Sequence, residues 1–463
     1  SHSSLLPLNY TRNPLPTSLR WCAALVVLLL GWSTAAPLSH AQIFVDADAT
    51  GADDGTSWTD AYTSLQDALD IASSADEIWI AAGTYYPDEG ASVTDGDVTA
   101  SFTVTGDQNS LDIYGGFAGT ETSLRDRIPG NETILSGDID QDDDPFAPQT
   151  DSDGDPNTPT QTDHINGSNS YHVFLFDGGD AIGSDVAANI TSITVLGAVT
   201  ITAGLADQAA APDDAGAGLF CDGEGSGNEC SPSILGVTFK GNAAGSLALT
   251  SGDLDVGGAL YNGGRRSGTS SPTIVNSAFF GNFAVRGGGA IVNDGDSDGT
   301  SSPTIVNSVF SDNHAGDGTG SGSGGAILND GFNNGTSSPT LIGVTVSGNF
   351  AEFAGGALYN NGFRGTAKPQ IINTIFWDNT AGRGNEVFSS ERPTEVPVYS
   401  YSLIRGSRGS GTNWSTANFG IDGGNNIDAD PLFVDATNAP GPDGLFGTPD
   451  DGLRLDTGSP AID

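Results

Sequence analysis

The sequence has very few positive charges. Among its 463 residues, Lys and Arg together number 15 against 58 Asp and Glu, so the formal net charge is −43. Only Lys240 and Lys368 are lysines. A chain this acidic is repelled by phosphate backbones and by anionic lipid surfaces. We therefore exclude nucleic acid as a partner.

Glutamate is also scarce, with ten residues against 48 aspartates. Glutamate favours helix interiors, whereas aspartate favours turns and caps. This bias predicts a turn-rich, all-β chain with little helix.

Long hydrophobic runs are missing as well. The single apolar run, Trp21–Gly31, holds about 11 residues and is too short to span a bilayer. Arg12 and Arg20 precede it, and Ser39-His40-Ala41 follows as a small-x-small cleavage signal. We interpret residues 1–41 as a secretory signal peptide. No later segment is a transmembrane candidate, so we expect a secreted, cell-surface or outer-membrane location.

Glycine, in contrast, is abundant: its 66 residues are about twice the average usage. Collagen is excluded because glycine does not occupy every third position. Simple disorder is excluded because Val, Ile, Leu and Phe recur in ordered runs.

The middle of the chain repeats. Four copies of Gly-Gly-Ala-Ile/Leu begin at Gly257, Gly288, Gly324 and Gly355, with a weaker copy at Gly216. Five prolines, each opening an apolar strand, alternate with these motifs: Pro232, Pro272, Pro303, Pro339 and Pro369. An asparagine stands ten positions after each proline: Asn242, Asn282, Asn313, Asn349 and Asn379. Since this interval is constant while the repeat length varies, the changes in length lie in loops.

A fixed strand core with a period of about 30 residues indicates a solenoid. We predict a right-handed parallel β-helix whose coils stack at the spacing of about 4.8 Å between strands. The five asparagines would stack at one corner as an amide ladder. Glycine permits the positive φ of a tight corner, and the alanine leaves room inside it.

The chain before the repeats predicts a cap. Ile43–Asp46 and Glu77–Tyr85 have the pattern of strands, and between them Thr63 or Ser64 can cap a short helix. The predicted apolar face of this helix is Leu65, Ala68, Leu69 and Ala72. We divide the chain into the signal peptide 1–41, the cap with the first coils 42–185, the repeats 186–390, and the last coils with the C-terminal segment 391–463.

A family resemblance rests on the repeats. Phe-x-x-Asn begins at Phe239, Phe279, Phe310 and Phe376, with Val346 in place of Phe in a fifth copy. Together with Gly-Gly-Ala-Ile/Leu, it resembles the repeats of the polymorphic outer membrane proteins, a family of autotransported β-helical surface adhesins. The flanks, such as Ile78–Tyr86 and Asp430–Asp435, resemble secreted bacterial choice-of-anchor β-helix proteins. These resemblances imply a solenoid of the pectate-lyase type, an adhesive role, and an anchoring or sorting element beyond the C-terminal segment.

Residues for catalysis do not converge in the sequence. A lyase of this fold needs acidic calcium ligands and a basic residue that abstracts a proton. The candidate bases are Arg265, Arg266, Arg286, Arg364 and Arg383. Arg286 and Arg383 each stand four residues after a repeat asparagine, which predicts that they lie on one side of the solenoid. The histidines His164, His172 and His314 belong to no metal-spaced cluster. No Gly-x-Ser-x-Gly motif is present. We therefore assign no catalytic residue.

Calcium is the predicted ligand, because aspartates alternate as they do in calcium-binding loops. Eight of them fall between Asp138 and Asp155. The two candidate sites are Asp151, Asp153 and Asp155, and Asp294, Asp296 and Asp298. A solvated acidic loop is the alternative for both.

Cys221 and Cys230 enclose a short polar loop. In an oxidising compartment we expect them to form a disulfide.

These observations predict an exported, monomeric β-helix acting as a non-catalytic adhesion or binding module for polysaccharide or cell-surface glycans. A calcium-dependent polysaccharide lyase or glycoside hydrolase is the first alternative. A structural envelope protein without a discrete ligand is the second.

Overall fold

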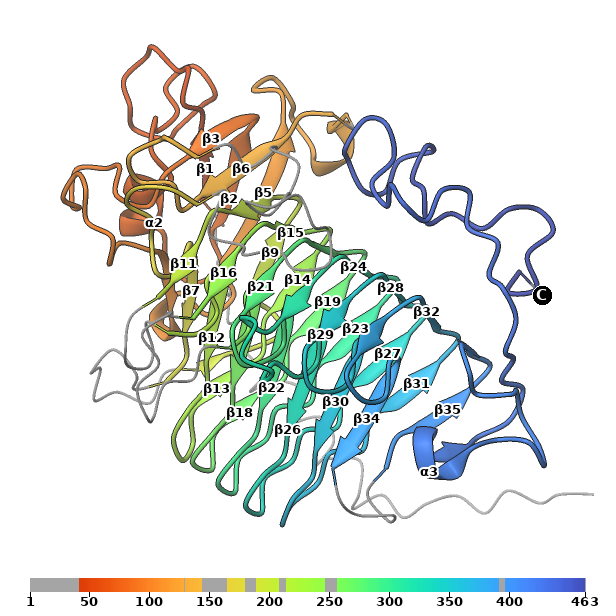
Figure 1. Cartoon of the computed structure of the whole chain (residues 1–463). Coiled ribbons are helices and arrows are strands. Elements are labelled where there is room, and N and C mark those ends of the chain that lie inside the picture. The colour runs from red at the N-terminus through yellow and green to blue at the C-terminus, as the bar shows by residue number, and fades with distance from the viewer. Residues whose placement is uncertain are drawn as a thin grey trace, which may run out of the picture. The chain divides into compact units, whose positions relative to one another are not determined.

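Short parallel strands stack one above another along a solenoid (Figure 1). The computed structural model describes residues 41–128, 130–143, 165–179, 189–207, 214–245, 256–390 and 396–462. The predicted signal peptide up to His40 and the candidate ligands Asp151, Asp153 and Asp155 lie outside these residues.

The longest sheet of the described chain has eleven strands. Its strands, in spatial order, are β1 (Gln42–Val45), β2 (Glu77–Ala81), β5 (Asp112–Phe117), β9 (Val195–Gly197), β14 (Ser233–Leu235), β19 (Thr273–Val275), β23 (Thr304–Val306), β27 (Thr340–Ile342), β31 (Gln370–Ile372), β35 (Val398–Ser400) and β37 (Ile421–Asp422). The strands opened by the repeat prolines pair in parallel and in register, as Ile274 with Ile305 shows.

In each coil, the next strand along the chain belongs to a nine-strand sheet. It contains β3 (Gly83–Tyr85), β6 (Thr133–Ser136), β10 (Thr200–Thr202), β15 (Thr238–Lys240), β20 (Ala278–Phe280), β24 (Val309–Ser311), β28 (Thr345–Ser347), β32 (Ile375–Trp377) and β36 (Leu403–Ile404).

An eight-strand sheet forms the third side of the coils. It contains β4 (Phe102–Thr105), β7 (Phe174–Asp177), β12 (Leu219–Asp222), β17 (Leu260–Gly263), β22 (Ile291–Asp294), β26 (Ile327–Asp330), β30 (Leu358–Asn361) and β34 (Val387–Ser390).

Two smaller sheets lie at the corners. One contains β11 (Leu205–Ala206), β16 (Ala243–Ala244), β21 (Phe283–Ala284), β25 (His314–Ala315), β29 (Phe350–Ala351) and β33 (Thr380–Ala381). The other contains β8 (Asn189–Ile190), β13 (Glu229–Cys230) and β18 (Thr269–Ser270). Since successive strands of each sheet are parallel neighbours from successive coils, the architecture is the predicted right-handed parallel β-helix.

The Gly-Gly-Ala corners show why two glycines are needed. The first glycine has a positive φ, 69° at Gly257. The second has no room for a side chain, because a Cβ on Gly258 would lie 2.0 Å from the carbonyl oxygen of Phe283. The alanine that follows, Ala259, is fully buried. A larger residue at either glycine therefore distorts the corner.

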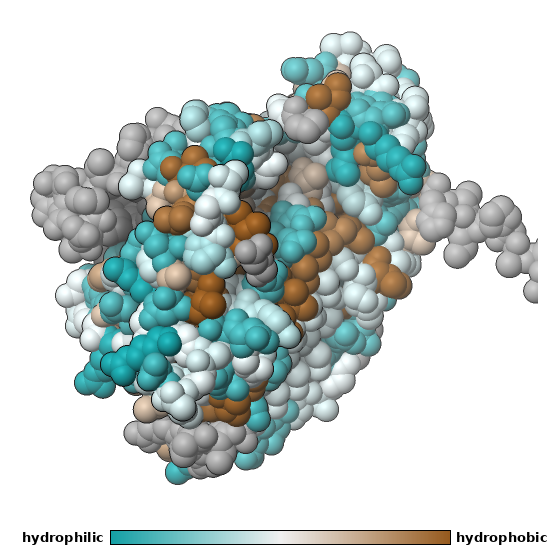
Figure 2. Space-filling model, turned by 90° about the vertical axis from the view of Figure 1, so that its right-hand side faces the viewer, coloured by the Kyte–Doolittle hydropathy of each residue, from teal (hydrophilic) through white to brown (hydrophobic). Residues whose placement is uncertain are grey.

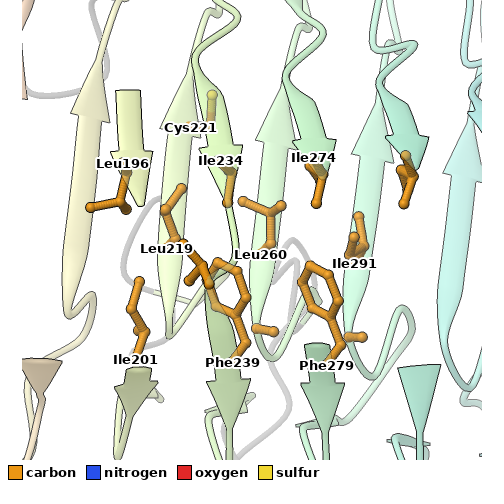
Figure 3. Packing of buried hydrophobic residues seen from close by; sticks show 14 of the residues in the cluster. Leu196, Ile201, Leu219, Cys221, Ile234, Phe239, Leu260, Ile274, Phe279 and Ile291 are labelled. Carbon is orange, nitrogen blue, oxygen red and sulfur yellow. The ribbon is translucent and has the colours of Figure 1, made fainter. Parts of the chain in front are cut away.

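The interior is a set of aligned apolar columns (Figure 3). Phe239, Phe279 and Phe310 stack with ring centroids 4.8 and 4.5 Å apart. Val346 and Phe376 continue this column in the next two coils. Each fully buried side chain of this size contributes about 1.5–3 kcal/mol through the hydrophobic effect.

A helix covers the first coils as predicted. It is α2 (Leu65–Ile71), and the side chain of Ser64 accepts a hydrogen bond from the backbone N–H of Asp67 at its N-terminus. Leu65, Ala68 and Leu69 are buried in the main core. Two short 3-10 helices, η2 (Gly106–Gln108) and η3 (Leu124–Asp126), lie in neighbouring loops.

The other end is closed by aromatic side chains and a short helix, α3 (Thr416–Phe419). Trp414 packs against Tyr399 of the last full coil and against Phe419 of α3. Beyond this point the chain runs back along the outside of the coils as an irregular C-terminal segment, residues 428–462 (dark blue in Figure 1).

Candidate functional site

A cleft of about 400 Å³ lies on the outer face of the nine-strand sheet, over its first strands. Its floor includes Thr238 and Lys240 of β15 and Phe280 of β20. Side chains alternate between the two faces of a strand, so these residues point outward because Phe239 and Phe279 point into the core. Its walls include Leu124, Arg127 and Glu132 from the segment before β6, and residues 444–448 of the C-terminal segment.

Two aromatic rings meet in this cleft. Phe280 comes from the repeat and Phe446 from the C-terminal segment, and their ring centroids lie 5.7 Å apart at an interplanar angle of 57°. Both residues are half-buried. The cleft therefore offers an apolar surface that water still reaches.

Polar groups surround these rings. The hydroxyl of Thr200 donates a hydrogen bond to Oε1 of Glu132, at 2.9 Å. Arg127 donates to the carbonyl oxygens of Leu124 and Gly115, at 3.0 and 2.9 Å. Burial lowers the pKa of Arg127, although its guanidinium stays charged at neutral pH. Lys240 adds a second cationic side chain to the lining.

A second cleft, of about 500 Å³, lies further along the same sheet. Its lining includes Ile375 of β32 and Leu403 of β36, together with Leu455, Pro460 and Ala461 of the C-terminal segment. Figure 2 views the molecule from the side of its last coils and shows hydrophobic residues gathered in a hollow between more polar ridges. The C-terminal segment thus lines both clefts, one near each end of the nine-strand sheet.

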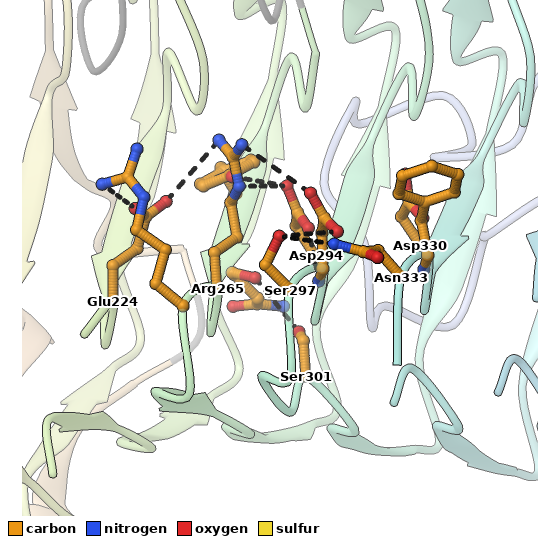
Figure 4. Close-up of polar contacts among 12 residues, drawn as sticks. Glu224, Arg265, Asp294, Ser297, Ser301, Asp330 and Asn333 are labelled. Atoms are coloured by element: carbon orange, nitrogen blue, oxygen red, sulfur yellow. Dashed lines mark hydrogen bonds and ion pairs between the residues drawn. The ribbon is translucent and has the colours of Figure 1, made fainter. Parts of the chain in front are cut away.

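A polar network lies at and just beyond the C-terminal ends of the central strands of the eight-strand sheet (Figure 4). The hydroxyl of Tyr261 donates a hydrogen bond to Oδ2 of Asp294, at 2.8 Å. The guanidinium of Arg265 lies beside three carboxylates: its Nε is 3.5 Å from Oδ2 of Asp294, and its Nη atoms are 3.9 Å from Oδ2 of Asp296 and from Oε1 of Glu224. Burial raises the pKa of Asp294, and the charge of Arg265 opposes this shift. The positive charge of Arg265 thus offsets part of the cost of burying these carboxylates.

The next coil adds a further acid to this network. Asp330 pairs in register with Asp294, and it accepts a hydrogen bond from Nδ2 of Asn361, at 3.1 Å. Burial and then the charge of Asp294 raise the pKa of Asp330 to about 7. Asp330 therefore carries a proton for part of the time at neutral pH.

This network bears on one of the two predicted calcium sites. Asp294 and Asp296 contact Arg265, and Asp298 lies beyond them in the turn with a φ of 64°. The oxygens of the three carboxylates do not gather as the ligands of one ion. Among the described residues, the one group of three acids whose oxygens lie within 4.8 Å of one another is Asp138, Asp140 and Asp142. The sequence places these three in the acidic stretch between Asp138 and Asp155 and does not distinguish them from its other aspartates.

The two histidines of the described chain serve packing. His172 lies against Phe220, and His314 is stacked between Phe283 and Phe350. Burial lowers the pKa of both imidazoles to about 4. Both are therefore neutral at physiological pH, as is usual for histidines packed in a core.

The candidate bases lie apart from the clefts. Arg286 and Arg383 occupy the same corner of the solenoid, with the coils of Ser323 and Ala354 between them. The guanidinium of Arg383 lies 5.1 Å from the ring centroid of Phe353. Neither arginine lines either cleft of the nine-strand sheet.

Two structural features named from the sequence are present. Cys221 and Cys230 form a disulfide. In the asparagine ladder, Nδ2 of each residue donates to Oδ1 of the next, at 3.0 Å for Asn242, 2.9 Å for Asn282 and 2.8 Å for Asn313 and Asn349. The ladder ends where Nδ2 of Asn379 donates to Oε2 of Glu386, at 2.6 Å.

The fold defines the class of protein: a right-handed parallel β-helix with a capping helix. Its structure is similar to the crystal structure of pectate lyase Pel9A, at 12% sequence identity and a TM-score of 0.41, over 90% of each chain. No protein-family model matches the sequence, and no curated protein sequence matches it either. In the described part of the chain, no helix is both long enough and apolar enough to cross a membrane.

The clefts were not predicted from the sequence. Their walls come from the C-terminal segment and from a loop before the repeats, and neither segment has a periodicity that places it against the sheet. The one available signal was Phe280, an aromatic residue at an outward position of a repeat strand.

Proposed function

We propose that the protein is an exported β-helix module that binds glycans along the nine-strand sheet without transforming them. The observation that supports this proposal is the cleft between that sheet and the C-terminal segment. Its volume falls in the range of about 300–1,000 Å³ that is usual for ligand sites. It combines aromatic rings with hydroxyl, carboxylate and cationic groups.

This combination suits a sugar. The C–H face of a pyranose ring packs on an aromatic ring, and its hydroxyl groups exchange hydrogen bonds with polar side chains. Phe280 and Phe446 supply the rings, while Glu132, Thr238 and Lys240 supply the polar groups. The second cleft on the same sheet suggests a ligand that extends over several coils, as a polysaccharide does.

Export and surface attachment belong to the proposal too. The signal-peptide pattern supports export, and a disulfide is typical of oxidising compartments. The resemblance of the repeats to those of the polymorphic outer membrane proteins supports an adhesive role. A non-catalytic role fits the packed histidines, and neither Arg286 nor Arg383 lines the two clefts of the nine-strand sheet.

Calorimetric titration with panels of neutral and uronate-containing oligosaccharides tests the proposal. We expect saturable binding that Phe446→Ala weakens about tenfold, which corresponds to about 1.4 kcal/mol. Phe363→Ala is the control, because Phe363 is an exposed ring that stacks on Phe332 in a different part of the molecule.

The same samples are assayed for new reducing ends and for unsaturated products. We expect neither. Turnover that is lost on changing Arg286 or Arg383 would establish the lyase or hydrolase alternative instead. An absence of binding across the whole panel would favour a structural envelope protein.

A further inference from the structure

Three carboxylates converge in the turn that follows strand β6. One oxygen from each of Asp138, Asp140 and Asp142 lies within 4.8 Å of the others. Asp138 is buried, with 6% of its surface exposed, and the other two are exposed. The backbone N–H groups of Asp142 and Asp143 donate to the Asp138 carboxylate, at 3.0 and 3.1 Å. The turn is therefore folded over Asp138.

A buried amide lies beside this turn and points to a ligand. Asn169 is directly opposite Asp138 in an antiparallel bridge. Residues in this position project to the same side, with Cβ atoms about 5 Å apart. Asn169 has 4% of its surface exposed, and its Nδ2 donates to Oδ2 of Asp143, at 2.6 Å, and to the carbonyl oxygen of Ala203, at 3.0 Å.

The other atom of this amide is not satisfied. Oδ1 of Asn169 is buried and receives no hydrogen bond. Buried polar atoms almost always have a partner, because water is no longer there to supply one. A cation beside Asp138 would provide that partner for Oδ1.

The charges at the site have no counterion among the described residues. Within the described chain, no Lys or Arg forms an ion pair with Asp138, Asp140 or Asp142. Because one oxygen from each of the three carboxylates lies within 4.8 Å of the others, their like charges repel one another. A bound cation would remove this repulsion.

The donor set favours one ion. All four groups offer hard oxygen atoms, which calcium and magnesium prefer. Calcium takes six to eight oxygen ligands in flexible arrangements, whereas magnesium demands near-octahedral geometry and keeps several of its waters. Three carboxylates and an amide carbonyl on one turn and its neighbouring segment therefore suit calcium.

We propose that Asp138, Asp140, Asp142 and Asn169 bind a calcium ion, which fastens the turn after β6 to the segment that leads into β7. Asp143 holds the Asn169 amide in place from outside the coordination shell. Water completes the coordination. The site is separate from the proposed glycan cleft and does not depend on it.

Calorimetry of the full chain, stripped of metal with a chelator and titrated with CaCl2, tests this site. We expect one calcium ion bound with a dissociation constant of about 0.1–1 mM, which is usual for extracellular modules. Asp140→Asn and Asp142→Asn should each weaken binding at least about tenfold, because affinity follows the number of charged ligands. Both residues are exposed, so both variants should fold. MgCl2 should bind at least about tenfold more weakly.

Two control variants distinguish this site from the others predicted. Asp298→Asn and Asp151→Asn should leave calcium binding unchanged. Loss of binding in Asp151→Asn with retention in Asp140→Asn would overturn the proposal, as would an absence of calcium binding by the unmodified chain.

Luminescence of terbium, which takes the place of calcium, gives a second measurement. Tyr85 of β3 pairs in register with Leu135 of β6, so the next residue, Tyr86, lies beside the start of the turn that contains Asp138. Excitation of tyrosine should therefore produce terbium emission. We expect Tyr86→Phe to reduce this emission without changing the calcium affinity. Emission unaffected by both Tyr86→Phe and Asp140→Asn would place the ion elsewhere.

Discussion

At the scale of single residues, Glu386 is an acid buried at a corner of the solenoid. It is 3% exposed and lies at the end of the asparagine ladder. Its Oε1 and the nearby hydroxyl of Tyr399 both lack a hydrogen-bond partner. Burial raises the pKa of Glu386 to about 8, although the hydrogen bond from Asn379 favours the charged form. The side chain is therefore largely protonated at neutral pH.

This shift makes stability depend on pH. In the unfolded chain Glu386 loses its proton near pH 4.5, whereas the folded protein keeps it until about pH 8. Between these values the folded state holds more protons, so the stability falls as the pH rises, by up to about 5 kcal/mol. Glu386→Gln accepts the same hydrogen bond without ionising. We expect its melting temperature to exceed that of the wild type increasingly from pH 5 to pH 9. Parallel profiles of the two proteins would contradict the assignment.

At the scale of elements, the asparagine ladder holds neighbouring coils together at one corner. Asn313 donates to Oδ1 of Asn349 and to the carbonyl oxygen of Phe279, and its own Oδ1 accepts from the backbone and side chain of Asn282. Each residue thus serves the coils on both sides. Because these groups are buried, removing one member leaves several of them without a partner.

We expect Asn313→Ala to destabilise the protein by about 3–5 kcal/mol, since each buried group left unsatisfied costs about 1–3 kcal/mol. Chemical denaturation measures the change. Asn418→Ala is the control, because Asn418 is an exposed residue of α3, and it should change the stability by less than about 0.5 kcal/mol. Equal effects of the two substitutions would show that the ladder does not stabilise this corner of the solenoid.

The repeated elements were predictable from the sequence because each coil faces the same packing problem. Proline, inward Phe and ladder asparagine recur at fixed intervals, so four or five copies identify the strands and the corner. The cap helix is indicated separately, by its capping serine and its apolar face. The clefts have no such redundancy. Arg127 and Phe446 have no equivalents in the other coils, and they lie far apart in the chain. Only the folded path of the C-terminal segment brings them together. The pairing of Asp138 with Asn169 likewise depends on a single antiparallel bridge across a long insertion.

At the scale of the whole molecule, the chain has a net charge of −43, and the solenoid stacks equivalent loops of successive coils on one another. Parallel stacking at about 4.8 Å brings equivalent side chains together. Asp294 and Asp330, paired in register on adjacent coils, show this directly. The unfolded chain spreads the same charges over a much larger volume. Self-repulsion therefore opposes folding.

Salt should relieve this repulsion. The screening length falls from about 10 Å at 0.1 M to about 3 Å at 1 M, which is less than the spacing between coils. We expect NaCl to raise the melting temperature by about 3–5 °C between 20 mM and 1 M, with most of the rise below about 0.5 M. A chelator is present throughout, so that calcium does not contribute. A rise that continued linearly to high salt would indicate exclusion of the salt from the protein surface instead. An unchanged melting temperature would show that repulsion between the carboxylates does not limit the stability of the folded protein.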